Sequence, residues 1–99
     1  MQTVTIIHVI KRCNKSAINL TARELGILVI LALKPMLART LSDHLEIPGP
    51  SVTRSTQTLR RHGLIATAKP AKDKRDALHS ITPKGLFILT GSHIAEQGI

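Results

Sequence analysis

The sequence predicts a small, mainly α-helical domain with one small β-hairpin, and three observations support this fold class. Leu37, Leu41 and Leu45 recur at four-residue spacing and give one helix an apolar face. A second stretch, over residues 50–62, separates apolar from polar side chains with the helical period. After Gly63, two short strand-like stretches flank a charged, proline-led segment, which is typical of a hairpin.

The N-terminal segment admits two interpretations. Residues 1–12 are rich in β-branched side chains, which favours a strand. The apolar residues of this segment also fit one face of a helix, and these residues are Ile6, Val9, Ile10 and Cys13. Both alternatives stay open at the level of the sequence. The polar residues 14–19 are expected to form a connection.

The first well-defined helix begins at a capping box, Thr21-Ala22-Arg23-Glu24. The Thr21 hydroxyl can accept a hydrogen bond from the backbone N–H of Glu24, and the Glu24 carboxylate can accept one from the N–H of Thr21. The helix should continue to about Leu33 and end at Lys34-Pro35. Because it is apolar almost all round, we expect it to be buried between its neighbours.

The helix predicted over 50–62 follows a turn at Glu46-Ile47-Pro48-Gly49 and starts with Pro50, which a first helical turn tolerates. Its inner side carries Val52, Leu59 and either Ser55 or Thr56. Its outer side carries Ser51, Thr53, Arg54, Gln57, Thr58 and Arg61. No carboxylate occurs between Pro48 and Ala71. An acid-free face of short hydrogen-bonding side chains suits the edge of a polyanion.

The hairpin follows directly. Gly63 is well placed to stop the preceding helix. Strands are expected over 64–69 and 77–82, with a polar, charged tip over 70–76 between them.

A last helix should begin at Thr82-Pro83, an N-cap followed by proline at the first helical position. Its apolar side carries Leu86, Leu89 and Ile94, and Gly91 is a point where it could be interrupted. The order of elements is that of a winged helix-turn-helix within a single domain, residues 1–99. We divide it into an N-terminal arm (1–19), a winged-helix core (20–85) and a C-terminal helix (83–99).

The charge of the chain favours a polyanionic partner. Fourteen Lys and Arg residues against six Asp and Glu residues give a net charge of +8. The isoelectric point of about 10.7 exceeds the value of roughly 9 that is typical of nucleic-acid-binding domains. Between residues 54 and 84, eight basic and two acidic residues account for six of the eight net charges.

Several classes of function find little support. Phe87 is the only aromatic residue, so no stacking platform for single-stranded nucleic acid is present. A single cysteine excludes an internal disulfide, and Cys13 is expected to be a small buried residue rather than a redox sensor. The histidines lack ligand spacing, so neither a metal site nor a cofactor is expected, and no catalytic set suggests an enzyme. We find no signal peptide, and the longest apolar run, 25–33, is too short for a bilayer, so a cytoplasmic protein is expected.

The chain resembles the MarR family of bacterial transcription regulators from Leu20 to Gly85. The spacing shared with that family is carried by short motifs. They are Leu20-Thr21, Leu41, Leu45, Ser51-Val52-Thr53-Arg54, Leu59, Gly63-Leu64-Ile65, Asp73, Arg75 and Ile81-Thr82-Pro83-Lys84-Gly85. The resemblance implies that the 50–62 helix enters the DNA major groove. It also implies that Arg75 at the wing tip enters the minor groove, with Asp73 orienting its guanidinium.

The residues expected to contact DNA lie on that helix and on the wing, 69–76. Lys69, Lys72 and Lys74 are expected to contact phosphates, because lysine is a flexible point charge. The full set is Pro50, Ser51, Thr53, Arg54, Gln57, Thr58, Arg61, Lys69, Lys72, Asp73, Lys74 and Arg75.

The sequence also departs from the family. Family members are typically longer, with terminal helices that form a dimer, so we expect no full dimerisation domain within these 99 residues. Glu46 stands where the turn commonly has glycine, and Pro48-Gly49-Pro50 replaces an acidic cap. The shortage of aromatic residues argues against a pocket for phenolic effectors.

The function expected from these observations is sequence-specific binding of double-stranded DNA by a transcription regulator, a repressor acting as a homodimer. Val4 to Ile10 and Leu86 to Ile94 are the apolar surfaces assigned to the subunit contact. The alternative is a winged-helix protein-interaction module or an antagonist that pairs with a full-length regulator.

Overall fold

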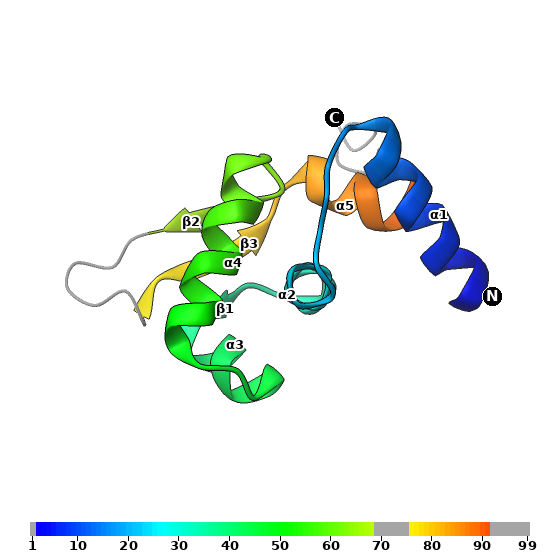
Figure 1. Ribbon diagram of the computed structural model, residues 1–99. Helices are drawn as coiled ribbons and strands as arrows, with labels where there is room; N and C mark the ends of the chain where they lie inside the picture. The colour runs from blue at the N-terminus through cyan, green and yellow to red at the C-terminus, as the bar shows by residue number, and fades with distance from the viewer. Residues whose placement is uncertain (1, 69–75, 92–99) are drawn as a thin grey trace.

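The computed structural model describes residues 2–68 and 76–91, with side chains from residue 6 onward. In Figure 1, α3, α4 and a small sheet form one end of the molecule, α1 and α5 form the other, and α2 runs between them. The elements are α1 (Gln2–Lys15), α2 (Ala22–Leu33), β1 (Met36–Leu37), α3 (Ala38–Leu45), α4 (Gly49–Arg61), β2 (Ile65–Ala68), β3 (Leu78–Ile81) and α5 (Pro83–Thr90). The fold is a winged helix-turn-helix, as the sequence predicts.

The helix-turn-helix forms because α3 and α4 bury complementary apolar faces. Leu41 of α3 and Leu59 of α4 have no exposed surface, and Val52 is 1% exposed. Between the helices, Glu46 adopts a left-handed backbone with φ of 54°. A residue with a Cβ is strained there, which explains why glycine suits this position of the turn.

One expected helical position is wrong. Leu37 belongs to β1 and stands before the first turn of α3 instead of lying within the helix. The buried position at the start of α3 is taken by Ala38, which is 8% exposed. Leu41 is fully buried and Leu45 is partly buried, so the remainder of the apolar face is confirmed.

The sheet contains three strands in the order β1-β3-β2, and both pairings are antiparallel. Strands β2 and β3 form the predicted hairpin, with Ile65 opposite Ile81 and Ala68 opposite Leu78. The third strand, β1, has only two residues and pairs with β3 through Met36 opposite His79. Such a short strand has no periodicity of its own, so its pairing partner defines it.

The predicted end of α4 and the predicted start of α5 are both confirmed, while β2 and β3 are shorter than the predicted strands. Gly63 has a φ of 75°, as a residue that ends a helix requires. The Thr82 hydroxyl accepts a hydrogen bond from Gly85 N at 3.1 Å and donates one to Gly63 O at 2.7 Å. Pro83 occupies the first turn of α5. These bonds fix where the helix that follows the wing begins.

The N-terminal segment is a helix, so the helical interpretation is confirmed and the strand interpretation is wrong. Val9 and Cys13, four residues apart, are 4% and 8% exposed and belong to the hydrophobic core. The Arg12 guanidinium donates hydrogen bonds from Nε to Ile88 O at 2.7 Å and from Nη2 to Leu89 O at 2.9 Å. It therefore satisfies carbonyl groups in the last turn of α5, where a cation is also favoured by the helix dipole.

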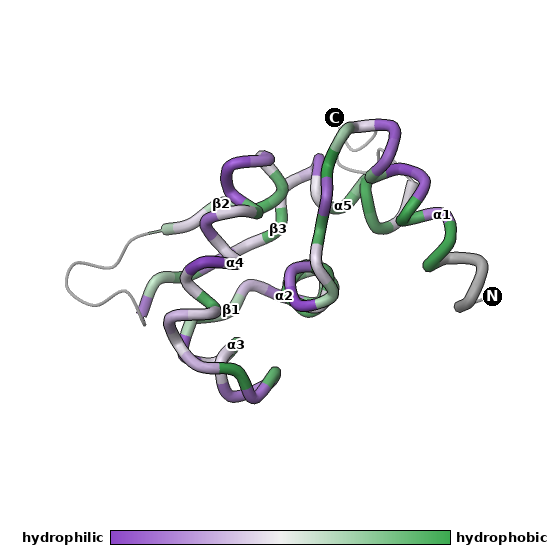
Figure 2. Tube along the Cα trace, in the orientation of Figure 1, coloured by the Kyte–Doolittle hydropathy of each residue, from purple (hydrophilic) through white to green (hydrophobic). Residues whose placement is uncertain are grey.

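Helix α1 packs on α5 of the same chain. This packing buries one part of the apolar surface of α1 and leaves another part exposed to solvent. Ile6, Ile7 and Ile10 are 57%, 47% and 52% exposed. Figure 2 shows apolar stretches along α1 and mainly polar residues along α4.

Burial raises the pKa of the Cys13 thiol, and the nearby Arg12 charge partly opposes this effect. The expected role of Cys13 as a small buried residue is confirmed.

Two other expectations about burial need correction. Helix α2 is not buried all round: Ile27, Leu28 and Leu31 are in the core, while Val29 is 49% and Leu33 80% exposed. An apolar composition therefore did not identify the buried face of this helix.

In α5, Ile88 is 1% exposed and carries more of the core than Leu86, which is only partly buried. Leu89 is buried as expected. Gly91, with a φ of 72°, caps the end of α5, and Ile94 lies outside the described residues. Within the described ranges, no helix has the length and apolar character needed to cross a membrane.

Candidate nucleic-acid interface

Helix α4 is held in the domain by one side, which leaves the opposite side outward. Val52, Ser55, Thr56 and Leu59 are buried. The Thr56 hydroxyl donates to Val52 O at 2.9 Å, so this buried polar group has its partner within the helix. The sequence offered Ser55 or Thr56 for the inner side, and the structure buries both.

The outer side of α4 brings together the helical residues predicted as the DNA contact. Pro50, Arg54, Gln57 and Arg61 are exposed. Ser51, Thr53 and Thr58 are half-buried. The Thr58 hydroxyl donates to Arg54 O at 3.2 Å, so its oxygen remains available mainly as an acceptor. Because Arg54 and Gln57 are exposed, the N–H donors of their side chains can reach base edges.

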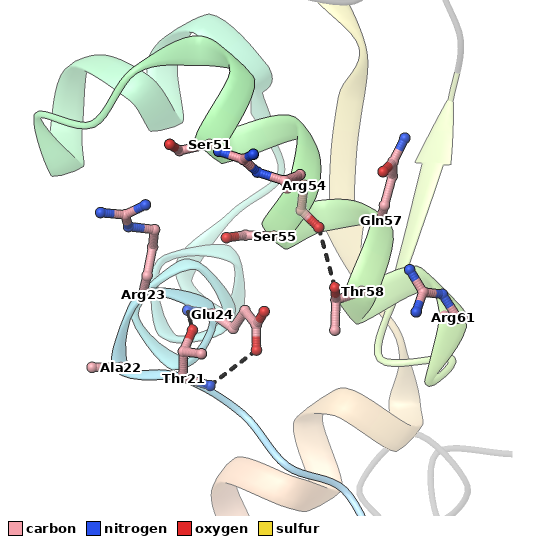
Figure 3. Close-up of a pocket in the computed structure, with 10 residues that line it drawn as sticks. All are labelled: Thr21, Ala22, Arg23, Glu24, Ser51, Arg54, Ser55, Gln57, Thr58 and Arg61. Atoms are coloured by element: carbon pink, nitrogen blue, oxygen red, sulfur yellow. Dashed lines mark hydrogen bonds between the residues drawn. The ribbon is translucent and has the colours of Figure 1, made fainter.

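A shallow groove of about 620 Å³ lies between the outer side of α4 and the N-terminal turn of α2. Figure 3 shows its lining. The groove is lined by Thr21, Ala22, Arg23, Glu24, Ser51, Arg54, Ser55, Gln57, Thr58 and Arg61. Three guanidinium groups against one carboxylate give this lining a net charge of +2.

The single carboxylate of the groove is already engaged. Glu24 is 9% exposed, and its Oε1 accepts a hydrogen bond from Thr21 N at 2.9 Å. The Thr21 hydroxyl accepts from Glu24 N at 3.1 Å, which completes the predicted capping box. The Glu24 carboxylate is therefore held in the first turn of α2, while the side chains of Arg23, Arg54 and Arg61 are exposed to solvent.

The opposite flank of α4 is also basic. Gln57, Arg60, Arg61 and Ile65 line a second hollow between the end of α4 and strand β2. Within residues 2–68 and 76–91, none of these arginines forms an ion pair with a carboxylate. Positive charge therefore borders α4 on both sides, and it is available to an external anion.

At the base of the wing, Arg39 of α3 forms an ion pair with Asp76. The Ala38 N–H also donates to Ala77 O at 3.0 Å, so α3 and the wing are joined at two neighbouring points. The sequence did not predict this connection, because the paired residues are far apart along the chain. The wing residues predicted to contact DNA, Lys69, Lys72, Asp73, Lys74 and Arg75, lie outside the described residues.

His79 is a buried histidine in the middle of the sheet. It is 4% exposed, and its Nδ1 forms a hydrogen bond with Thr67 Oγ1 at 2.8 Å. Burial lowers the pKa of His79 below its ordinary value of 6.5, and the charge of Arg60 lowers it further. The neutral imidazole is thus the form that the folded domain favours.

The stability of the domain should therefore fall when the solution is acidified. Because the pKa of His79 is lowered by folding, the unfolded chain takes up a proton more readily than the folded one. The contribution of His79 is complete above pH 6.5 and is lost as the pH falls through the lower folded value. Urea unfolding between about pH 7 and pH 5 measures this effect, because that range includes the ordinary pKa of histidine.

The matched controls are two histidine variants. His79→Gln should remove most of this pH dependence, because an amide does not titrate in this range. His44→Gln, at an exposed position of α3, should retain it. An equal pH dependence in wild type and His79→Gln would contradict the role assigned to His79.

Helix α4 exposes its basic side, and a two-stranded wing follows it in the chain. This arrangement defines the winged helix-turn-helix class of DNA-binding domains. A family model described as the MarR family matches residues 18–76, more than half of the chain. The protein belongs to the MarR family of transcription regulators. The resemblance to this family, inferred from residues between Leu20 and Gly85, is thereby confirmed, and the family model covers it as far as residue 76.

Solved structures of MarR-family regulators share the fold. Zinc-responsive ZitR of Lactococcus lactis is 27% identical with a TM-score of 0.64, over 82% of this chain and 56% of ZitR. Wild-type ZitR in complex with DNA is 25% identical with a TM-score of 0.63, over 82% of this chain and 55% of ZitR.

The adhesin competence repressor AdcR of Streptococcus pyogenes is 20% identical with a TM-score of 0.65, over 98% of this chain and 71% of AdcR. The chain spans little more than half the length of the ZitR chains that it matches. No curated protein matches the sequence.

In the described residues, no group of three or more His, Cys, Asp or Glu side chains is arranged to hold a metal ion.

Proposed function

We propose that this protein is a sequence-specific, double-stranded DNA-binding repressor that places α4 in the major groove. One observation carries the proposal: the outer side of α4 is exposed, basic and free of carboxylates. A protein surface of that composition is suited to the phosphates and base edges of a duplex. The DNA complex of ZitR, a structure that this chain resembles, supports the same use of the fold.

Within this proposal the residues of α4 have different roles. Arg54 and Gln57 are exposed. The guanidinium of Arg54 can donate two hydrogen bonds to O6 and N7 of guanine, whereas the amide of Gln57 can donate to N7 and accept from N6 of adenine. Ser51, Thr53 and Thr58 are short enough to let the helix approach the bases. Pro50 and Arg61 lie near the two ends of α4, beside the duplex backbone. The wing residues, with Arg75 in the minor groove and Asp73 orienting it, complete the contact.

The proposed active form is a homodimer in the cytoplasm, without catalytic activity or a cofactor. One recognition helix covers about half of a two-fold site, so two copies are needed for a full operator. Ile6, Ile7 and Ile10 form an exposed apolar strip on α1 and are the side chains we assign to the subunit contact. Occupancy of an operator by such a dimer excludes other proteins from the same DNA, which is the simplest form of repression.

Binding to duplex DNA at several salt concentrations tests the proposal. Neutralising several phosphates releases counterions, so the logarithm of the affinity should fall linearly with the logarithm of salt concentration. With five to ten phosphate contacts the slope should be roughly −4.5 to −9. A flat dependence, or no binding at low salt, would remove DNA as the partner.

A second candidate is an antagonist that pairs with a full-length regulator. The exposed isoleucines of α1 favour it, because they could be covered by another family member instead of a second copy. A stable complex with such a regulator, together with loss of DNA retention, would support this alternative. The antagonist alternative gives no role to the acid-free outer side of α4, which therefore favours DNA binding.

A further inference from the structure

We propose that Arg23, at the N-terminal turn of α2, is a sequence-independent contact to the DNA backbone on the side of α4 opposite the wing. The inference rests on the proposed DNA-binding function and assigns part of that surface to a defined portion of the duplex. Arg23 was not among the residues expected from the sequence, because more than twenty-five residues separate it from Ser51.

The position of Arg23 follows from how α2 meets α4. The capping box fixes the first turn of α2, with Thr21 N bonded to Glu24 Oε1 at 2.9 Å and Glu24 N to Thr21 Oγ1 at 3.1 Å. Arg23 lies between these two residues and is exposed. Figure 3 shows its side chain projecting from α2 beside the N-terminal half of α4, where Ser51 and Arg54 border the same groove.

The geometry of a duplex explains why a cation is useful there. A helix in the major groove, which is about 12 Å wide, has a phosphate backbone on each side. On one side of α4 lie Arg60 and the hairpin, next to β2. On the other side lies the N-terminal turn of α2, where Arg23 supplies a guanidinium. The two flanks of α4 are thus equipped for the two backbones.

The electrostatics of the groove agree with a phosphate as its occupant. Among the described residues Arg23 has no carboxylate partner, and Glu24 is buried and engaged in the cap. The guanidinium fork matches the oxygens of a phosphate. Because Arg23 belongs to α2 and lies outside the base-reading side of α4, its contact should carry no sequence information.

The test compares Arg23→Ala with wild type on two labelled duplexes, one selected from a random pool as a preferred site and one unrelated. Loss of one phosphate contact should reduce the salt slope by about 0.9. One phosphate contact raises the logarithm of the affinity by about 0.9 when the salt concentration is lowered tenfold from 1 M. At 0.1 M salt the variant, which lacks that contact, should therefore bind both duplexes roughly eightfold more weakly than wild type. Arg23→Lys should retain most of the slope, since it retains the charge.

Lys11→Ala, which removes an exposed positive charge on α1, is the matched control and should leave the slope unchanged. An unchanged slope for Arg23→Ala beside a steep wild-type slope would overturn the assignment of Arg23 and leave the proposed function standing. A loss confined to the preferred duplex would make Arg23 a base reader and would also overturn it. A flat wild-type slope would instead reject the proposed function itself.

Discussion

Replacing Gly85 with alanine should cost the domain about 3 kcal/mol of stability, at the upper end of the range for overpacking. A Cβ at this position would collide with the backbone oxygen of Leu64 and would lie 2.8 Å from Cγ1 of Ile81. The Leu64 carbonyl cannot simply move away, because it accepts a hydrogen bond from Thr82 N at 3.0 Å. Urea unfolding followed by circular dichroism measures the change.

Gly49→Ala is the matched control. Outside its chain neighbours and the adjacent backbone of α4, no atom lies within 4 Å of a Cβ built at Gly49, which starts α4 and has no positive φ. Alanine there should change the free energy of unfolding by less than about 1 kcal/mol, because the restriction of the unfolded chain is opposed by crowding between the new Cβ and the following Pro50. If Gly85→Ala proved as stable as Gly49→Ala, the close contact between α5 and the Leu64 carbonyl would be wrong.

The second large effect is expected at Arg54. Arg54→Ala should weaken binding to a preferred duplex by roughly 1–3 kcal/mol, or about 5- to 150-fold, and should relax the choice of base at one position. The reason is that Arg54 is exposed on the outer side of α4, where its guanidinium can donate two hydrogen bonds to a base edge. Arg75→Ala should have an effect of similar size through the minor groove.

Selection of preferred duplexes and titration of each variant measure both the affinity and the specificity. Arg54→Ala should unfold at the same urea concentration as wild type, because the removed atoms are exposed. Lys11→Ala removes the same formal charge from α1 and should bind preferred DNA almost as wild type does. Unaltered affinity and base preference in Arg54→Ala would remove this residue from the proposed contact.

The candidate interface illustrates what a linear sequence can and cannot predict. The outer side of α4 could be predicted because residues of one helix share a face by periodicity alone. The groove beside it could not be predicted, since Arg23 and Arg54 come from helices separated by β1, α3 and a turn. The ion pair between Arg39 and Asp76 was missed for the same reason. Charge counting located the basic region but did not show which acids were already engaged.

Local chemistry determined most of the winged-helix core. The capping box at Thr21 and Glu24, the stop at Gly63 and the N-cap at Thr82 all formed where the sequence indicated. Each depends on hydrogen bonds or backbone angles within a few residues, so neighbouring sequence suffices to specify it.

Tertiary packing decided the features whose local preferences were balanced or absent. The sequence of residues 1–12 allowed a strand, but the segment forms helix α1, whose Val9 and Cys13 are buried in the core. Strand β1 exists through its pairing with β3, and His79 is buried because the sheet encloses it. Which side of the apolar helix α2 faces solvent was likewise settled by its neighbours. In each case the deciding free energy comes from contacts between distant parts of the chain, which local propensity does not contain.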